Sequence, residues 1–515
     1  MFNIIYLSPT SLTIELDNKD IYYAKNSYDV YVNDSVYLKD VKTNVVSIYD
    51  LSPNTEYKIK IGDSEKIIKT LDVSVIFNID DFGVKKDGIH DDTKAINQAI
   101  MMLPENGLLF FGPGVYRITS IFLKSNIHIE LKKGATLLAL EDVEEYPTFV
   151  GEIERFDKTD HVQLGQWEGS PYPMKASIIS GYWLKNINLY GLGVIDGNAQ
   201  NSTWWINHKT KPYGRPRLLF LDKCENVQIQ GVSFQNTPCW TLHPFYSKNI
   251  GFYDIRITNP KDSPNTDGMD PESCDNVKII GVVFSVGDDC IAIKSGKMYM
   301  GMKYQTPSSN FVIRNCLMKD GHGGVVLGSE MSGGIKNLSV ERCIFQNTDR
   351  GLRIKTRRGR GKYCIVDGVE FHDIIMDNVL TPLVINMFYF CDPDGKTEYV
   401  WSKEKLPVDD RTPYLGKFTF NRITAINSEW AAGYFYGLPE MPIEEIVIKD
   451  STFTMKDNAS SGEPAMMSFI KPVSKIGFYF NNVNKVIFDN VTLSNQDGEK
   501  VIQENVGNIE IKWVH

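Results

Sequence analysis

The chain has 515 residues, of which 42% are hydrophobic and 23% are charged, so it can bury a large core and is not predominantly disordered. No stretch approaches the roughly 18 consecutive apolar residues that a membrane-spanning helix needs. The formal net charge of −9 argues against a generic binder of nucleic acid or anionic membranes, because the overall field repels polyanions.

The first 72 residues are predicted to form a separate small β module. Short runs such as 11–16 and 57–61 alternate apolar and polar residues, which is the period of half-buried strands. The segment from Leu51 to Tyr57 resembles the corner of fibronectin type III domains, where a tyrosine hydroxyl bonds back to the upstream backbone. The resemblance implies a fibronectin type III-like β-sandwich over residues 1–72, to which no chemistry is assigned.

A second domain is predicted over residues 75–515, beginning with a short helix. Two adjacent aspartates, at 91 and 92, are candidate N-caps. An apolar stripe follows them, formed by Ala95, Ile96, Ala99 and Ile100. This pattern predicts an amphipathic helix near 91–102. We expect the helix to cap the open end of the structure that follows, since bare strand edges promote association.

The rest of the chain repeats itself. A unit of asparagine, apolar residue, any residue and apolar residue recurs at Asn226, Asn249, Asn276, Asn310 and Asn337, in steps of 23, 27, 34 and 27 residues. A period in this range implies a solenoid. The alternation with period two excludes helical repeats, so the predicted fold is all-β: a parallel β-helix in which each coil stacks its short strands on the previous coil.

The cysteines bear on the redox environment. All eight lie between Cys224 and Cys391, and none forms a Cys-x-x-Cys pair, so the spacing of a metal site is absent. Several occupy equivalent places in the repeats, and we interpret them as small, buried, reduced residues, with disulfides as the alternative. The N-terminus lacks the basic start and continuous apolar stretch of a secretory signal. These features favour a cytoplasmic protein, with a mature secreted protein as the alternative.

Four short motifs lie about one repeat apart and carry three acids, a histidine and two cations. They are Asn265-Thr266-Asp267, Gly287-Asp288-Asp289, Gly321-His322-Gly323 and Arg353-Ile354-Lys355. The steps are 21 residues from aspartate to aspartate, 33 from aspartate to histidine and 31 from histidine to arginine. Residues one period apart in a solenoid lie on the same face, so these side chains are predicted to line one groove.

The residue types suit hydrolysis of a glycosidic bond in an acidic polysaccharide. Such hydrolysis needs one carboxylic acid to protonate the leaving oxygen and a carboxylate to activate water. Repulsion between the adjacent Asp288 and Asp289 would hold a proton on one of them, and Asp267 can lie across a water molecule. The arginine and lysine of the fourth motif suit a sugar carboxylate. They open a run of six cations without an acid, residues 353–362, which is predicted to be a local positive patch.

In this order the four motifs resemble the signature of family 28 glycoside hydrolases, the polygalacturonases. The resemblance runs from about Asp81 to at least residue 390. It implies a right-handed parallel β-helix and hydrolysis of α-1,4-galacturonan with inversion, without a metal or other cofactor. Two features depart from the family pattern: many members lack an N-terminal sandwich, and the segment before Ile187 is long here.

The resemblance also implies roles for the motif residues. Asp288 would be the general acid, while Asp267 and Asp289 would position and deprotonate the attacking water. His322 would support the hydrogen-bond network of the acid. The arginine and lysine of the fourth motif would grip the carboxylate of a galacturonate ring.

Three further residues are predicted to contact the substrate. Residues 383–389 resemble the strand that carries the family's substrate-binding tyrosine, which makes Tyr389 a candidate. Asn265 belongs to the first motif, and its alternative role is backbone hydrogen bonding at a coil corner. His243 is either a substrate contact or a buried structural histidine.

Two segments interrupt the repeat, at 142–180 and 391–415, and both are rich in aromatic and charged residues. Insertions of this length in a compact solenoid are usually functional or disordered. We hypothesise that they close one end of the groove. The enzyme would then be exo-acting from the non-reducing end, like exo-acting bacterial members of the family, and would release galacturonate or a short oligomer.

Other functions fit parts of the pattern. Among hydrolases, the alternative is a rhamnogalacturonan or xylogalacturonan hydrolase. A pectate lyase would need a bound calcium ion. A non-catalytic β-helical carbohydrate-binding or adhesion protein would explain the repeats but not the clustered acids and cations. The expected partner is a pectic polysaccharide or oligogalacturonide, with no nucleic acid and no membrane, and the oligomeric state is not predicted.

Overall fold

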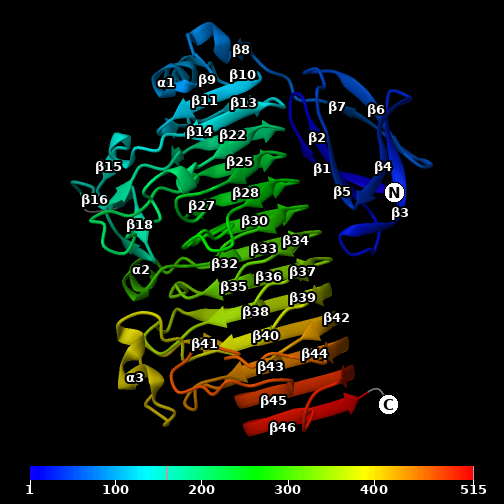
Figure 1. Cartoon of the computed structure of the whole chain (residues 1–515), viewed down its shortest axis with the longest axis vertical. Helices are drawn as coiled ribbons and strands as arrows, with labels where there is room; N and C mark the ends of the chain where they lie inside the picture. Colours follow the sequence, from blue (N-terminus) through cyan, green and yellow to red (C-terminus); the bar gives the residue numbers. More distant parts are fainter. Residues whose placement is uncertain (158–160, 514–515) are drawn as a thin grey trace.

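The computed structural model describes residues 1–157 and 161–513 (Figure 1). The fold is mostly β, and a small N-terminal module lies beside a tall right-handed parallel β-helix. The predicted fold class is therefore confirmed. Residues 158–160 of the insertion at 142–180, and residues 514–515 of the predicted second domain, lie outside the described residues. Within the described part of the chain, no helix is long and apolar enough to span a membrane.

The N-terminal module consists of two antiparallel sheets around a small core of its own. One sheet has the order β1 (Phe2–Leu7), β2 (Leu12–Leu16), β5 (Val45–Ile48), and the other has the order β4 (Ser35–Thr43), β3 (Tyr23–Val32), β6 (Glu56–Ile61), β7 (Ser64–Lys69). At the predicted corner, the Tyr57 hydroxyl oxygen accepts a 2.8 Å hydrogen bond from the backbone N–H of Ser52. This bond ties the turn before β6 to the strand itself.

The module packs against the side of the β-helix through polar and aromatic contacts. The Glu15 carboxylate, only 4% exposed, accepts hydrogen bonds of 2.7 and 2.8 Å from Arg314 and of 3.0 Å from Arg342. The ring of Tyr6 lies 5.6 Å from the ring of Tyr253. Removing one partner of a buried ion pair is strongly destabilising, so these contacts hold the module in a defined place on the coils.

Each coil of the β-helix contributes up to three strands, and strands of successive coils pair in parallel to form three ladders. The first ladder contains β8 (Ile76–Asn78), β10 (Gly107–Phe111), β13 (Ile127–Leu131), β22 (Lys185–Gly191), β25 (Glu225–Gln230), β28 (Lys248–Tyr253), β30 (Asp275–Ile280), β33 (Ser308–Arg314), β36 (Ile335–Glu341), β39 (Ile365–Asp377), β42 (Lys417–Ser428), β44 (Ile443–Met455), β45 (Ile476–Ser494) and β46 (Val501–Trp513). The second contains β9 (Asp87–Asp91), β11 (Gly114–Ile118), β14 (Ala135–Ala139), β23 (Val194–Asp196), β26 (Ser233–Gln235), β29 (Arg256–Thr258), β31 (Val283–Ser285), β34 (Leu317–Lys319) and β37 (Ile344–Gln346), and it merges with the first at the long strand β39.

The third ladder carries the functional residues described below. It contains β12 (Ile121–Phe122), β21 (Ile179–Tyr182), β24 (Leu219–Asp222), β27 (Leu242–Phe245), β32 (Asp289–Ile293), β35 (Gly323–Gly328), β38 (Arg350–Lys355), β40 (Thr381–Asn386) and β43 (Ala431–Tyr436), with isolated bridges at Met269 and Glu272 linking β27 to the coil of β32. Because alternate residues of a strand point to opposite faces, each of these strands presents one set of side chains to the core and one set outward.

The remaining elements lie outside the three ladders or at their ends. The helices are α1 (Thr93–Met102), α2 (Met298–Tyr304) and α3 (Glu398–Trp401), with 3-10 turns η1 (Ile79–Phe82), η2 (Val143–Glu145), η3 (Ala199–Asn201) and η4 (Asp394–Lys396). The first insertion forms small antiparallel pairs: β15 (Thr148–Phe149) with β20 (Met174–Lys175), β16 (Glu152–Glu154) with β17 (His161–Gln163), and β18 (Gln166–Trp167) with β19 (Ser170–Pro171). Strand β41 (Tyr414–Leu415) pairs with β39.

The recurring asparagine turns the chain at a coil corner. Asn226, Asn249 and Asn276 have left-handed φ values of 58°, 57° and 54°, a conformation that asparagine tolerates better than most residues. The side chains also bond to one another. The Asn276 amide donates to Asn249 at 2.8 Å, and the Asn249 amide donates to Asn226 at 3.0 Å. One residue type therefore sets the corner and links neighbouring coils.

Aliphatic, aromatic and cysteine side chains fill the coils as one continuous core. Helix α1 covers the N-terminal end of this core and buries Ile96, Ala99 and Ile100 in it (Figure 1). All eight cysteines are free, and seven of them are buried as predicted. The prediction of a buried position is wrong for Cys391, which is exposed because it belongs to the second insertion and not to a repeat.

Candidate active site

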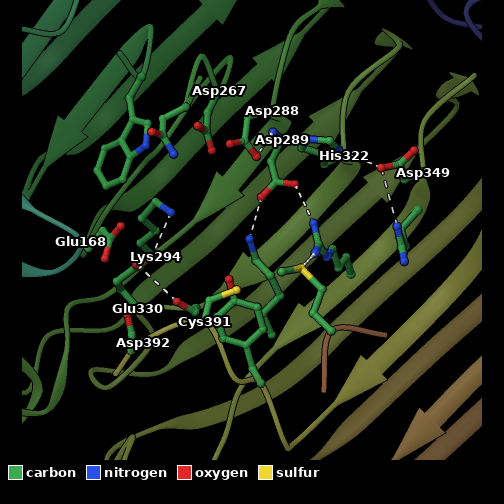
Figure 2. Close-up of a pocket in the computed structure, with 18 of the residues that line it drawn as sticks. Glu168, Asp267, Asp288, Asp289, Lys294, His322, Glu330, Asp349, Cys391 and Asp392 are labelled. Atoms are coloured by element: carbon green, nitrogen blue, oxygen red, sulfur yellow. Dashed lines mark hydrogen bonds and ion pairs between the residues drawn. The ribbon is translucent and has the colours of Figure 1, made fainter. Parts of the chain in front are cut away.

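A cavity of about 440 Å³ opens on the outer face of the third ladder (Figure 2). Asp289 begins β32, and Arg353 and Lys355 lie two coils later at alternate positions of β38, so their side chains point to the same face. All the residues that the four motifs single out line this cavity: Asn265, Asp267, Asp288, Asp289, His322, Arg353 and Lys355. Coil stacking thus brings together side chains that are far apart in the sequence.

Asp289 is the charged member of the acidic cluster. Its Oδ2 accepts a 2.8 Å hydrogen bond from Lys355 Nζ, and its Oδ1 accepts one of 3.3 Å from Arg353 Nη1. Burial alone would raise the pKa of Asp289, but the charges of Lys355 and Arg353 lower this pKa well below its ordinary value. The two cations therefore hold Asp289 as a carboxylate.

Asp288 and Asp267 are shifted in the opposite direction. Burial, followed by the Asp289 carboxylate, raises the pKa of Asp288. Burial, followed by the neighbouring Asp270, raises the pKa of Asp267 well above its ordinary value. The three aspartates present oxygens within 4.8 Å of one another. Carboxyl groups whose pKa values are driven apart in one cavity suit division of labour between acid and base.

His322 lies beside Asp288 and is paired with Asp349. The Nδ1 atom of His322 is 2.8 Å from Oδ2 of Asp349, and this hydrogen bond raises the pKa of His322. The backbone N–H of His322 donates to the Asp288 carbonyl at 3.0 Å. The sequence analysis missed Asp349, although its position 27 residues after His322, one coil along, was a usable signal.

Asn265 and Tyr389 also line the cavity. The Asn265 side-chain oxygen accepts a 2.6 Å hydrogen bond from Arg215, and its φ of 55° places it at a corner. Both roles considered for Asn265 are therefore compatible with its position. Tyr389 is 8% exposed, and Lys355 Nζ lies 5.8 Å from the centre of its ring, so Lys355 stands between Asp289 and Tyr389.

His243 does not reach the cavity wall, which corrects its assignment to substrate binding. It is fully buried on β27, where its Nε2 lies 3.2 Å from Glu272 and 3.0 Å from the Gln166 amide. Burial lowers the pKa of His243 well below its ordinary value, so the ring is neutral. Its position matches the structural alternative, since it helps to hold Gln166, the neighbour of the cavity residue Trp167.

The basic run at 353–362 is not, as a whole, the local positive patch predicted from the sequence, which assigned a role only to Arg353 and Lys355. Arg353 and Lys355 reach the cavity. The arginines that follow are buried and paired with acids distant in sequence: Arg357 and Arg360 with Asp392, and Arg358 with Glu440. The patch prediction is wrong because folding places acidic side chains next to these arginines. The resulting ion pairs hold the loops that carry the acids.

A buried ion cluster, missed by the sequence analysis, forms another part of the wall. Lys294 Nζ lies 3.0 Å from Glu330 and 3.4 Å from Asp270, and 4.6 Å from the ring centre of Trp240. Burial would raise the pKa of Glu330, but Lys294 and then Arg360 lower it to about 2. The only sequence signal was the place of Lys294 directly after the strand that Asp289 begins.

The two insertions meet at one side of the cavity and form a wall there. Lys297 Nζ lies 3.5 Å from Glu168 in the first insertion and 3.2 Å from Asp392 in the second. We call Glu168, Lys297 and Asp392 the end clamp. Trp167, next to Glu168, stacks on Trp240 of the β-helix with 5.5 Å between ring centres. Both insertions therefore contribute wall residues, as Figure 2 shows for Glu168, Cys391 and Asp392.

The three aspartates lie close enough together to be compared with a metal site. Lys355 and Arg353 already bind both oxygens of Asp289, and Oδ1 of Asp288 accepts a 3.0 Å hydrogen bond from the backbone N–H of Asp289. Ca²⁺ takes about 6–8 oxygen ligands, and two positive side chains would stand beside it here. The donor set therefore fits a divalent cation poorly.

Comparison with known proteins agrees with this site. The family model "Glycosyl hydrolases family 28" matches residues 134–410, more than half of the chain, and the model "Rhamnogalacturonase A/epimerase, pectate lyase-like" matches residues 76–132. A probable polygalacturonase of Vitis vinifera is 34% identical over 313 residues, which are 58% of this chain and 62% of that protein. The alignment thus spans less than two thirds of that relative's length.

Two solved structures have the same architecture. A hyperthermoactive exopolygalacturonase from Thermotoga maritima is 26% identical, with a TM-score of 0.66 over 81% of this chain and 91% of that one. The family 28 exopolygalacturonase of Yersinia enterocolitica is 18% identical, with a TM-score of 0.75 over 99% of this chain and 98% of that one. At this identity the similarity supports the fold alone. From the family match, the chain belongs to family 28 of the glycosyl hydrolases.

Proposed function

We propose that the protein hydrolyses α-1,4-galacturonosidic bonds of polygalacturonate or oligogalacturonides, from the non-reducing end. The observation that carries the proposal is the meeting of three aspartates with Arg353 and Lys355 in one cavity. Groups for acid–base chemistry and groups that pair with a sugar carboxylate thus lie beside the same bond. Similarity to proteins named polygalacturonase and exopolygalacturonase supports the same substrate.

Asp288 is the proton donor in this proposal. Its raised pKa keeps the carboxyl group protonated while Asp289 is ionised. The proton passes to the glycosidic oxygen as the bond from that oxygen to the anomeric carbon breaks. The carboxylate left on Asp288 is then stabilised by the neighbouring His322, whose raised pKa favours the charged imidazole.

Asp267 and Asp289 hold the attacking water. Inverting pairs of carboxylates are usually about 6.5–9.5 Å apart, whereas these three present oxygens within 4.8 Å of one another. We therefore place the water between the Asp289 carboxylate and the neighbouring Asp267, whose carboxyl group burial makes harder to ionise, and not on an isolated base. Asp289, the ionised member, takes up a water proton as the oxygen bonds to the anomeric carbon, Asp267 helps to orient that water, and the product has the inverted configuration. Proton exchange with solvent after product release restores Asp288.

The end clamp supports cleavage from the chain end. Lys297 joins the two insertions through Glu168 and Asp392, and Asp392 is also held by Arg357 at 2.9 Å and by Arg360 at 3.0 Å. In this proposal, a wall held in this way stops a polymer from continuing past the terminal ring. The terminal ring would fill the cavity, with its carboxylate near Arg353 and Lys355.

Product analysis tests the proposal. Wild-type protein acting on long polygalacturonate should release galacturonate or one short oligomer from the first time point, and NMR should show the β-anomer appearing first from the α-linked substrate. An early ladder of mid-length oligomers would contradict exo-cleavage. An initial α-anomer would contradict inversion. The absence of new reducing ends would contradict hydrolysis and favour a non-catalytic carbohydrate-binding protein.

The same assay separates the rival activities. A lyase would produce an ultraviolet-absorbing double bond and would lose activity with a chelator, whereas the proposed hydrolase should do neither. A rhamnogalacturonan or xylogalacturonan hydrolase would prefer decorated chains over unbranched polygalacturonate. Ranking kcat/KM for the three polysaccharides decides among them.

We also propose that the N-terminal module is fibronectin type III-like and that the protein is cytoplasmic. The bond between Tyr57 and Ser52 supports the first proposal, and the eight free cysteines support the second. An experimental structure of the module that lacks the sandwich topology, or recovery of the protein outside the cell, would overturn the respective proposal.

A further inference from the structure

A second hollow, of about 430 Å³, adjoins the walled cavity and shares Asn265, Asp288 and His322 with it. Apart from Gly287, its other wall residues come from two loops, around 208–209 and 261–264, and Lys209 and Lys261 in these loops are exposed. We call it the open hollow. Asp288 therefore borders two spaces, one closed by the end clamp and one that faces solvent.

The two lysines of the open hollow differ from the cations of the walled cavity because they are exposed and can pair with a ligand. The Lys261 side chain is 76% exposed, and its nearest acid, Asp320, is 3.7 Å away. Lys209 is exposed and has no ion pair within the part of the chain that the structure describes. One acid, the exposed Asp262, also lines the hollow. Burial lowers the pKa of His208, so this histidine adds no charge at neutral pH.

The position of Asp288 decides what the open hollow can hold. The group that protonates the leaving oxygen must lie between the ring that is cut off and the chain that leaves. If the terminal ring occupies the walled cavity, the leaving chain must continue on the other side of Asp288. The open hollow also borders Asp288 and adjoins the walled cavity, so it is the space available to that chain.

We propose that the open hollow binds the leaving, reducing-side units of an acidic polysaccharide, and that Lys209 and Lys261 pair with their carboxylates. This inference rests on the proposed function and deepens it. Each galacturonate unit carries one carboxylate, so two successive leaving units offer one charge for each lysine. Exposed ion pairs of this kind are weak and sensitive to salt. They would raise the capture of long chains without fixing where the chain is cut.

The test compares the double variant Lys209→Ala/Lys261→Ala with wild type, measuring kcat/KM on long polygalacturonate at low and at high salt. We expect a loss of about tenfold at low salt, since each exposed pair contributes up to about fivefold, and little loss at 0.5 M NaCl. The first product should be unchanged. Lys209→Arg/Lys261→Arg should restore most of the rate. Lys211→Ala, which removes a charge from the same loop outside the hollow, is the control and should lose much less.

The outcomes separate this inference from the function on which it rests. If the wild type hydrolyses polygalacturonate but the double variant equals wild type at low salt, the inference is wrong and the proposed function stands. The same holds if Lys211→Ala loses as much as the double variant, or if the loss persists at high salt. If the wild type does not cleave polygalacturonate at all, the proposed function fails and the inference fails with it.

Discussion

The two spaces on either side of Asp288 use the same residue types in opposite ways. Around the walled cavity the cations are buried or half-buried and already paired: Lys297 with Glu168 and Asp392, and Lys355 with Asp289. In the open hollow Lys209 and Lys261 are exposed, and Asp320, the acid paired with Lys261, is 3.7 Å away. Buried pairs hold a geometry and are little screened, whereas exposed charges attract a ligand and are screened within about 10 Å at 0.1 M salt.

This difference suggests that one site can control the position of cleavage and the rate of substrate capture separately. We expect the walled side to decide which bond is cut, because its shape is held by buried or half-buried ion pairs that salt screens only weakly. We expect the open side to decide how fast a charged chain is captured. Variants on the two sides should therefore change different observables.

The largest effect is expected at Asp288, which both spaces share. Asp288→Asn should lower kcat by about 10²–10⁴-fold or more, because an amide cannot donate the proton to the leaving oxygen. Binding of oligogalacturonate, measured by calorimetry, should be retained. Asp410→Asn, the same change at an exposed acid remote from the cavity, should leave kcat unchanged. A near-normal rate for Asp288→Asn would place the reaction elsewhere.

The next effect concerns the pH profile on the walled side. Lys355→Met removes the nearest positive charge from Asp289 and one of the charges that lower the pKa of Asp288. Without that charge each carboxylate is harder to form, so both pKa values rise and both limbs of the kcat/KM profile should move to higher pH. The rate at acid pH should fall most, because Asp289 becomes protonated there. The two limbs report the coupled acids as a group.

A control variant tests whether removing a different lysine from the same basic run has the same effect on the pH profile. Lys362→Met removes an exposed cation from the same basic run and should leave both limbs in place. If Lys355→Met lowered kcat/KM equally at every pH, Lys355 would bind substrate without setting the charge of the acids.

A smaller change in rate but a change in product is expected at the end clamp. Lys297→Met leaves Asp392 with its arginines but releases Glu168, so the first insertion should loosen. We expect longer first products from polygalacturonate, with kcat within about tenfold of wild type, and Lys297→Arg should restore the wild-type product. Unchanged first products would mean that the clamp does not define the chain end.

A second variant disturbs the neighbourhood of the end clamp without removing the lysine. Gly169 has a φ of 73°, and an added Cβ would lie 2.6 Å from the backbone nitrogen of Lys297. Gly169→Ala should therefore displace the hairpin β18–β19 and shift the products in the same direction. Agreement between the two variants would exclude an effect of the lysine charge alone.

The smallest change is expected from salt acting on the wild type. Raising NaCl from 0.05 to 0.5 M should lower kcat/KM on long chains by about tenfold or less through the open hollow. The length of the first product should not change. A change in product length with salt would contradict the separation of the two sides.

Much of the architecture was predictable because it depends on the spacing of residues that are close together in the sequence. The repeat of asparagine and alternating apolar residues reports a coil corner and a half-buried strand, and both depend on neighbours in sequence. The steps between the four motifs approximate one coil, so Asp267, Asp288, Asp289 and His322 could be placed together before any coordinates. Asp349, one coil after His322, obeys the same rule and was available to it.

The insertions were detectable only as interruptions of that spacing. Their composition marked 142–180 and 391–415, but not that Glu168 and Asp392 would meet at Lys297. The basic run illustrates the same limit. The sequence predicts that its arginines form a positive patch, but in the folded protein Asp392 and Glu440 lie beside them and pair with them. Likewise, nothing in the neighbourhood of His243 revealed that Glu272 and Gln166 would bury it.

By itself, then, the sequence determined the coiled architecture and the catalytic-type cluster, because a solenoid converts regular separation along the chain into contact across coils. Only the tertiary structure decided which charges are paired, which side of the cavity is walled and where the open hollow lies. Those features depend on irregular loops and distant acids, whose meeting is set by the packing of the whole molecule and leaves no period in the chain.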